Sequence, residues 1–200
     1  MPPAKRPEPI TLGWREWVAL PDWDVAHLKA KLDTGARTSS LHAFGLEWFD
    51  RTGTPWVRFE IHPWQRSTAD SVIAEAAVVA TRDVRSSSGD VEHRPVVHTS
   101  LLLAGRAVTA EVTLTRRDEM GFRMLVGREA LRHRFLVDPA VSYLGGRPDR
   151  SIRRRNRGDE SATSQPNDAH TDADTSGTST GTSSGTSTSS HRSRSPRKPT

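Results

Sequence analysis

The sequence predicts a closed, all-β domain, and three features of the chain support this prediction. Short runs of alternating apolar and polar residues, the period of a half-buried strand, recur between residues 10 and 147. Turn-forming residues such as Gly, Pro and Asp separate these runs. Only residues 129–135 are expected to form a helix, so a closed β architecture is favoured over alternating strands and helices.

The first half of the domain contains the clearest strands. Apolar and polar residues alternate from Val25 to Leu32, and this strand runs directly into Asp33-Thr34-Gly35-Ala36. A second strand over residues 41–49 and a third over 56–62 flank a turn. Residues 72–79 fit either a strand or a short helix, and we expect a strand because several of them are β-branched.

The second half is expected to contain hairpins. A polar, Gly-containing tip at residues 86–90 separates two strand-like runs. A further hairpin spans Leu101 to Leu114 and turns at Gly105. Residues 124–126 form a short buried run that ends at Gly127, just before the expected helix.

Composition divides the chain into a flexible N-terminus (1–9), a folded domain (10–147) and a tail (148–200). Ser and Thr account for 21 of the 50 residues from 151 to 200, and Ile152 is the only large apolar residue there. Such a segment cannot bury enough apolar surface to offset the entropy lost on ordering it. We therefore expect the tail to be disordered.

Charge and cysteine content limit the partners and the compartment. The net charge is +5, and eight Lys or Arg against five Asp or Glu from residue 151 onward leave the rest of the chain nearly balanced. The tail either contacts nucleic acid or another polyanion weakly or is simply solvated, and we favour the second interpretation. The chain has no Cys, no apolar leader and no run that could span a membrane. We expect a soluble, cytoplasmic protein without membrane contacts.

Asp33-Thr34-Gly35, at the end of an alternating strand, is the first candidate for chemistry. A turn stabilised by the Asp or Thr side chain would account for such a tripeptide. The other interpretation is a catalytic carboxylate beside a Gly that permits a tight turn and a close backbone N–H. Taken alone, the tripeptide favours the structural turn.

A second segment, Met124 to Leu131, reverses this preference. It places an apolar triplet before Gly127-Arg128 and a short helix. Together the two segments resemble the retropepsin family of aspartic peptidases, whose chains carry Asp-Thr-Gly-Ala and a later apolar-apolar-Gly-Arg segment. The chain is also similar to a bacterial and archaeal group described as ATP-dependent zinc proteases and associated with the ribosomal-protein glutamate ligase RimK. This similarity covers about residues 10–145 and depends on four segments, namely residues 31–36, 87–97, 125–128 and 135–139.

The resemblance implies a retropepsin-like β-barrel and peptide hydrolysis by two carboxylates that share one proton. One carboxylate takes a proton from the attacking water, and the other hydrogen-bonds the carbonyl oxygen. Because each chain supplies only Asp33, the pair requires a homodimer, and no cofactor is implied. The resemblance assigns catalytic roles to Asp33, Thr34 and Gly35, substrate-binding or flap roles to Ala36, Ser87, Ser88, Gly89 and Arg94, and the second motif to Val126, Gly127 and Arg128.

The chain departs from the viral retropepsins around Arg128. The viral chains carry an acid shortly after the first motif, which pairs with the Arg of the second, whereas Arg37 follows Ala36 here. The acids considered as replacements are Glu75, Asp83 and Asp118. The two motifs are also further apart than in the viral enzymes, which predicts an insertion within residues 50–80.

Two alternatives to an aspartic peptidase remain open. A metal-dependent peptidase would need a zinc site assembled from distant His and Asp residues, because the sequence has no His-Glu-x-x-His and no phosphate-binding loop. A peptide-binding module of the same fold would hold a peptide under the flap without cleaving it. Acidic or glutamate-rich peptides are the expected substrates, because five arginines lie in or near the motifs, namely Arg37, Arg82, Arg85, Arg94 and Arg128.

Overall fold

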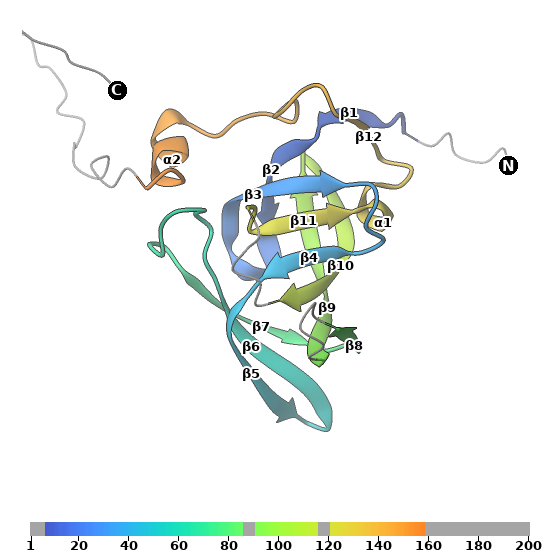
Figure 1. Cartoon of the computed structure of the whole chain (residues 1–200), viewed down its shortest axis with the longest axis vertical. Helices are drawn as coiled ribbons and strands as arrows, with labels where there is room; N and C mark the ends of the chain where they lie inside the picture. The colour runs from blue at the N-terminus through green and yellow to red at the C-terminus, as the bar shows by residue number, and fades with distance from the viewer. Residues whose placement is uncertain (1–6, 86–90, 116–120, 159–200) are drawn as a thin grey trace, which may run out of the picture. The chain divides into compact units, whose positions relative to one another are not determined.

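The computed structural model of the chain describes residues 7–85, 91–115 and 121–158. Six strands close into a barrel in which each strand pairs with two neighbours (Figure 1). In order around the barrel they are β10 (Arg106–Thr115), β4 (Ser39–His42), β11 (Met124–Gly127), β3 (Val25–Asp33), β2 (Arg15–Leu20) and β9 (Val91–Leu103). The closed, all-β architecture predicted from the sequence is confirmed.

One further strand, β8 (Ala80–Arg85), extends the barrel sheet beyond β9. The two strands pair antiparallel, with Arg82 opposite Arg94 and Arg85 opposite Val91. They are the arms of the predicted hairpin. Its tip, which includes Ser87, Ser88 and Gly89 of the predicted flap, lies outside the described residues.

Two smaller sheets accompany the barrel. A three-stranded sheet of β5 (Phe44–Arg51), β6 (Thr54–Ile61) and β7 (Val72–Ala77) projects from it at the lower end of Figure 1 and occupies the region of the predicted insertion. The strand expected over 41–49 is therefore two strands, because the chain leaves the barrel at Ala43. β1 (Ile10–Gly13) pairs in parallel with β12 (Phe135–Asp138).

Helices are few and short. A 3-10 turn covers Pro21–Trp23, and α1 (Arg128–Leu131) is shorter than the predicted helix over 129–135. A second helix, α2 (Arg150–Arg155), lies in the region that was expected to be a disordered tail. None of the helices in the described part of the chain is long and apolar enough to cross a bilayer.

Strand β3 shows how the barrel positions the candidate site. Leu28, Ala30 and Leu32 are buried in the core, whereas the residues between them face outward. Because side chains alternate along a strand, the same period directs Asp33 away from the core at the point where the strand ends. The Asp33 carboxylate is partly exposed, and β3 holds its backbone in place.

A buried carboxylate fastens the segment after β12 to the barrel. Glu16 is fully buried in β2, where it shares the inward phase of Val18 and Leu20. Its Oε1 accepts hydrogen bonds from the backbone N–H groups of Gly13 at 2.7 Å and Leu144 at 2.9 Å, and its Oε2 accepts one from Gly145 at 3.1 Å. Three backbone donors are therefore satisfied by one side chain.

We expect Glu16→Gln to destabilise the protein by about 2–3 kcal/mol, because an amide NH₂ in place of one oxygen leaves a buried donor unpaired. Urea unfolding at 25 °C measures the change. Glu47→Gln is the matched control, since Glu47 is exposed and makes only a 3.9 Å ion pair with Arg58. Its cost should stay below about 0.5 kcal/mol, and equal costs for the two variants would contradict the assigned role of Glu16.

Candidate active site

The turn after β3 holds the Asp33 carboxylate through its own backbone. Oδ1 accepts hydrogen bonds from the N–H groups of Gly35 at 3.0 Å and Ala36 at 3.1 Å. Within the described residues, Oδ2 accepts none. One oxygen is thereby fixed while the other is open, so the structural turn predicted from the tripeptide is present and it orients the carboxylate.

The second motif lies directly behind this turn. β11 pairs in parallel with β3, with Gly127 opposite Asp33 and Val126 opposite Leu32. The N–H groups of Arg128 and Glu129 donate to the carbonyl oxygens of Ala36 at 2.9 Å and Arg37 at 3.1 Å. The two motifs, which are far apart in the sequence, therefore form one rigid unit around Asp33.

Gly127 makes this close approach possible. A Cβ at this position would overlap the carbonyl group of Thr38 and would lie only 2.9 Å from the carbonyl oxygen of Arg37, closer than van der Waals contact allows. The N–H of Gly127 donates to Ser39 Oγ at 3.1 Å, which adds a further bond between the motifs. Only a residue without a side chain fits here.

Arg128 stabilises the turn without a carboxylate partner among the described residues. Its Nη1 donates to the carbonyl oxygen of Gly35 at 3.3 Å. Glu75 is not the replacement acid, because it pairs with Arg51 and Arg58, and hydrogen bonds from these two arginines lower the pKa of its carboxyl group. Asp83 pairs instead with His93, and Asp118 lies outside the described residues.

The β8 arm of the hairpin contacts the same loop through Arg82. Its Nη1 donates to Thr38 Oγ1 at 2.5 Å, and its Nη2 forms an ion pair with Glu111 of β10. Arg94, the predicted flap residue, lies opposite Arg82 and is partly buried. Arg82 therefore joins this strand to the loop that follows the Asp33 turn.

A hollow of about 430 Å³ opens beside Thr34. It is bounded by α1 and β12, with apolar walls at Leu131, Phe135 and Leu136. Leu136 is 56% exposed, so it adds apolar surface beside this hollow. Thr34 itself is exposed, and its hydroxyl makes no hydrogen bond with the described residues.

The described residues do not supply a zinc site. They contain no group of three or more His, Asp or Glu side chains that could hold a metal ion. The His–carboxylate pairs in this part of the chain are His62 with Glu60 at 3.1 Å and His93 with Asp83 at 2.5 Å. Two protein ligands are fewer than the three or four that zinc sites use.

Sequence reasoning missed several residues that build the site. Ser39 and Thr38 connect the first motif to Gly127 and to the β8 arm of the hairpin, but isolated hydroxyl residues after a turn carry no recognisable signal. Glu16 did carry a recognisable signal, since it is a charged residue at a position where the alternation of β2 places side chains in the core. The Arg82–Glu111 pair joins two strands, and its spacing along the chain does not reveal it.

Comparison with known proteins places this geometry in a family. The model of the RimB-like family, described as retropepsin-like aspartic endopeptidase RimB, matches residues 11–148. Proteins named probable alpha-L-glutamate ligase from Shewanella halifaxensis and Parasynechococcus marenigrum are 46% and 44% identical over 68% and 67% of the chain. The chain spans only 30% and 29% of these relatives.

Among solved structures, the chain is similar to a protein of unknown function from Legionella pneumophila. The two share 29% sequence identity with a TM-score of 0.58, over 68% of this chain and 98% of the other. The family match covers both motifs and the whole barrel, and the parallel pairing of β3 with β11 brings those motifs together. The chain therefore belongs to the RimB-like family of retropepsin-like aspartic endopeptidases.

Proposed function

We propose that the chain is an aspartic endopeptidase that hydrolyses peptide bonds with two Asp33 carboxylates, one from each chain of a homodimer. The observation that carries this proposal is the geometry of Asp33. Two loop N–H groups hold Oδ1, whereas Oδ2 accepts no hydrogen bond from the described residues. A carboxylate oriented in this way can take a proton from water without first rearranging.

In the proposed reaction, the two carboxylates lie about 3 Å apart and share a proton. The ionised one removes a proton from water, whose oxygen attacks the carbonyl carbon of the peptide. The protonated one hydrogen-bonds the carbonyl oxygen as negative charge develops on it. Collapse of the tetrahedral intermediate breaks the C–N bond, the nitrogen takes up a proton, and a free carboxylate and amine leave.

The surface around Thr34 supports the homodimer. Thr34 is exposed, and the apolar hollow with exposed Leu136 adjoins it. Among the described strands β12 pairs only with β1, and a free strand edge readily pairs with another chain. A second copy related by a two-fold axis would cover the apolar surface and bring its own Asp33 beside the first.

Two observations support an acidic, glutamate-rich substrate. Arg37 and Arg128 are exposed beside the Asp33 turn, and neither has a carboxylate partner among the described residues. The curated relatives, which contain this domain within longer chains, are named glutamate ligases. A peptidase joined to such a ligase would be well placed to act on glutamate-containing products.

Cleavage of labelled peptides by the purified protein tests the proposal. At low salt we expect a ten-residue glutamate peptide to be cleaved with a kcat/KM about ten-fold higher than a neutral peptide. The difference should shrink towards 1 M salt, where charges are screened beyond about 3 Å. The active species should have the mass of two chains and should keep its activity in EDTA.

The other outcomes separate the alternatives. Equal rates for acidic and neutral peptides at low salt would remove the acidic preference. Activity that EDTA abolishes would favour the metal-dependent peptidase. Tight binding without cleavage under all conditions would favour the peptide-binding module of the same fold.

A further inference from the structure

A small cavity lies on the outer face of the barrel, between β2 and β3 on one side and residues 143–157 on the other. Its volume is about 160 Å³. Trp17 and Lys29, which form a cross-strand pair, make its floor. The side chains that line it include Trp17, Lys29, Tyr143, Arg147, Arg153 and Arg157.

The charge of this cavity is uncompensated. Four of its lining residues are cations, none is an acid, and none of the four forms an ion pair within the described part of the chain. The Nε of Arg153 is buried and has no hydrogen-bond acceptor among the described residues. Because a buried donor without a partner is unfavourable, an anion in the cavity would stabilise it.

The aromatic rings hold cations and leave little room for a base. The Tyr143 ring has Arg147 Cζ at 4.9 Å, Arg15 Cζ at 5.2 Å and Lys29 Nζ at 5.6 Å from its centroid. Cations over ring faces are stabilised there, so they stay in place around the cavity. The remaining space suits a single carboxylate or phosphate group, not a nucleobase stacked on a ring.

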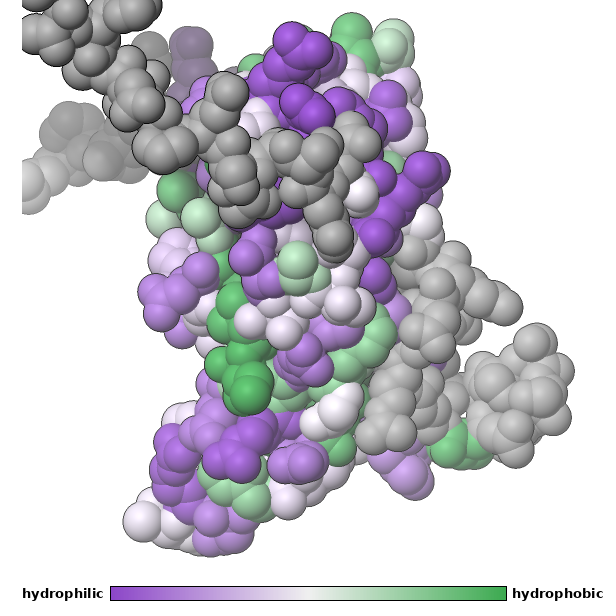
Figure 2. Space-filling view, turned by 90° about the vertical axis from the view of Figure 1, so that its left-hand side faces the viewer, coloured by the Kyte–Doolittle hydropathy of each residue, from purple (hydrophilic) through white to green (hydrophobic). Residues whose placement is uncertain are grey.

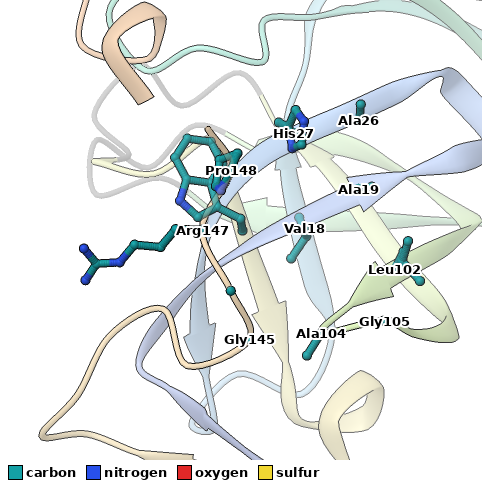
Figure 3. Close-up of a pocket in the computed structure, with 12 residues that line it drawn as sticks. Val18, Ala19, Ala26, His27, Leu102, Ala104, Gly105, Gly145, Arg147 and Pro148 are labelled. Atoms are coloured by element: carbon teal, nitrogen blue, oxygen red, sulfur yellow. The ribbon is translucent and has the colours of Figure 1, made fainter. Parts of the chain in front are cut away.

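A neighbouring hollow of about 300 Å³, shown in Figure 3, shares Trp17 and Arg147 with the cavity. Its other walls are mostly small or apolar, as at Val18 and Leu102, and the guanidinium of Arg147 points away from these two residues. The concentration of positive charge therefore belongs to the smaller cavity.

Contacts elsewhere hold α2 in position, so the cavity does not depend on a ligand. Arg155 Nη1 donates to Asp70 Oδ2 at 2.9 Å, and Asn156 Oδ1 accepts from the N–H of Gln65 at 3.2 Å. α2 lies on the left-hand side of Figure 1, which is the side that faces the viewer in Figure 2. The upper half of that face is rich in hydrophilic residues. Arg153 is therefore presented to the cavity by an anchored helix.

The cavity is connected to Asp33 by a single strand. Lys29, Lys31 and Asp33 lie on the same outward face of β3. Asp33 lies four positions after Lys29 on the strand, which is about 13 Å at about 3.3 Å per residue. An extended peptide of about four residues covers the same distance.

We propose that this cavity binds a carboxylate of an acidic peptide substrate, several residues away from the bond that is cleaved. This inference rests on the proposed peptidase function and assigns it a second recognition site. The cations Lys29 and Arg153 bind the carboxylate, and Lys31 lies between them and the reacting bond.

Binding of a fluorescein-labelled ten-glutamate peptide to the Asp33→Asn protein, followed by anisotropy at low salt, tests the inference. We expect Arg153→Gln and Lys29→Gln, which lie on different elements, each to weaken binding about ten-fold, the scale of a charge-assisted hydrogen bond. Arg150→Gln is the matched control, because it removes the same charge from the same helix at an exposed position outside the cavity. Its affinity should stay within about two-fold of the parent, since exposed charges contribute little.

In the active protein, Arg153→Gln should raise KM for the acidic peptide while kcat, and kcat/KM for a neutral peptide, stay unchanged. Equal weakening by Arg153→Gln and Arg150→Gln would show that only net charge matters and would overturn the site. Tighter binding of inorganic phosphate or oligothymidine than of the peptide would assign the cavity to phosphate groups and equally overturn it.

The two proposals fail in different ways. If cleavage depends on Asp33 but not on Arg153 or Lys29, only the proposed role of the cavity is rejected. If peptide binding depends on Arg153 but the wild-type protein cleaves no peptide, only the proposed peptidase function is rejected.

Discussion

Asp33→Asn is expected to lower kcat for peptide cleavage by about 10³-fold or more, since proton transfer by a positioned group contributes on this scale. Asn keeps the oxygen that accepts from Gly35 and Ala36, so the turn and the fold should persist. It cannot take a proton from water. The rate of peptide cleavage and the urea midpoint, measured together, separate loss of chemistry from loss of structure.

Asp24→Asn is the matched control, because Asp24 is an exposed residue just before the other end of β3. Asp24→Asn should leave the rate of peptide cleavage and the urea midpoint unchanged.

Mixing wild-type and Asp33→Asn chains tests the homodimer. A ten-fold excess of Asp33→Asn chains should capture most wild-type chains in mixed dimers. Activity per wild-type chain then falls about ten-fold if the two-fold pair is required. Cleavage by Asp33→Asn at the wild-type rate would contradict the mechanism.

The features that the sequence predicted correctly are those that local patterns determine. The alternation in β3 fixes which side chains face the core, and the Asp33 turn is stabilised by bonds between residues two and three positions apart. The hairpin of β9 and β10 turns at Gly105, whose φ of 73° favours a residue without a side chain. The pairing of β3 with β11 is different, because it joins distant segments and was expected only from the resemblance.

The features that the sequence missed depend on distant contacts. The arginine-rich segment 150–155 has the composition of a disordered tail, yet it forms a helix because Asp70 and Gln65 supply partners for Arg155 and Asn156. The helix that begins at Arg128 ends early, because Arg132 leaves the helical region with a ψ of 131° and His133 follows with a φ of 64°. No local pattern marks either outcome.

Gly127→Ala is expected to destabilise the protein by about 3 kcal/mol, because the added Cβ meets backbone atoms of Thr38 that cannot move independently. Gly127 has a φ of −79°, which any residue can adopt, so the cost is steric rather than conformational. If the loop shifts to make room, the Asp33 carboxylate shifts with it. A displacement of about 1 Å is enough to lower activity about 10²-fold.

Gly121→Ala is the control that isolates this close approach. A Cβ on Gly121 meets nothing within 4 Å, and its φ is not in the left-handed region, so the change should cost less than about 0.5 kcal/mol. Urea unfolding and peptide cleavage are measured for both variants. Similar stability of the two would mean that the loop yields easily, and the rigid unit formed by the two motifs would then not exist. A loss of both stability and activity confined to Gly127→Ala would show that Gly127 acts by holding the Asp33 loop in place.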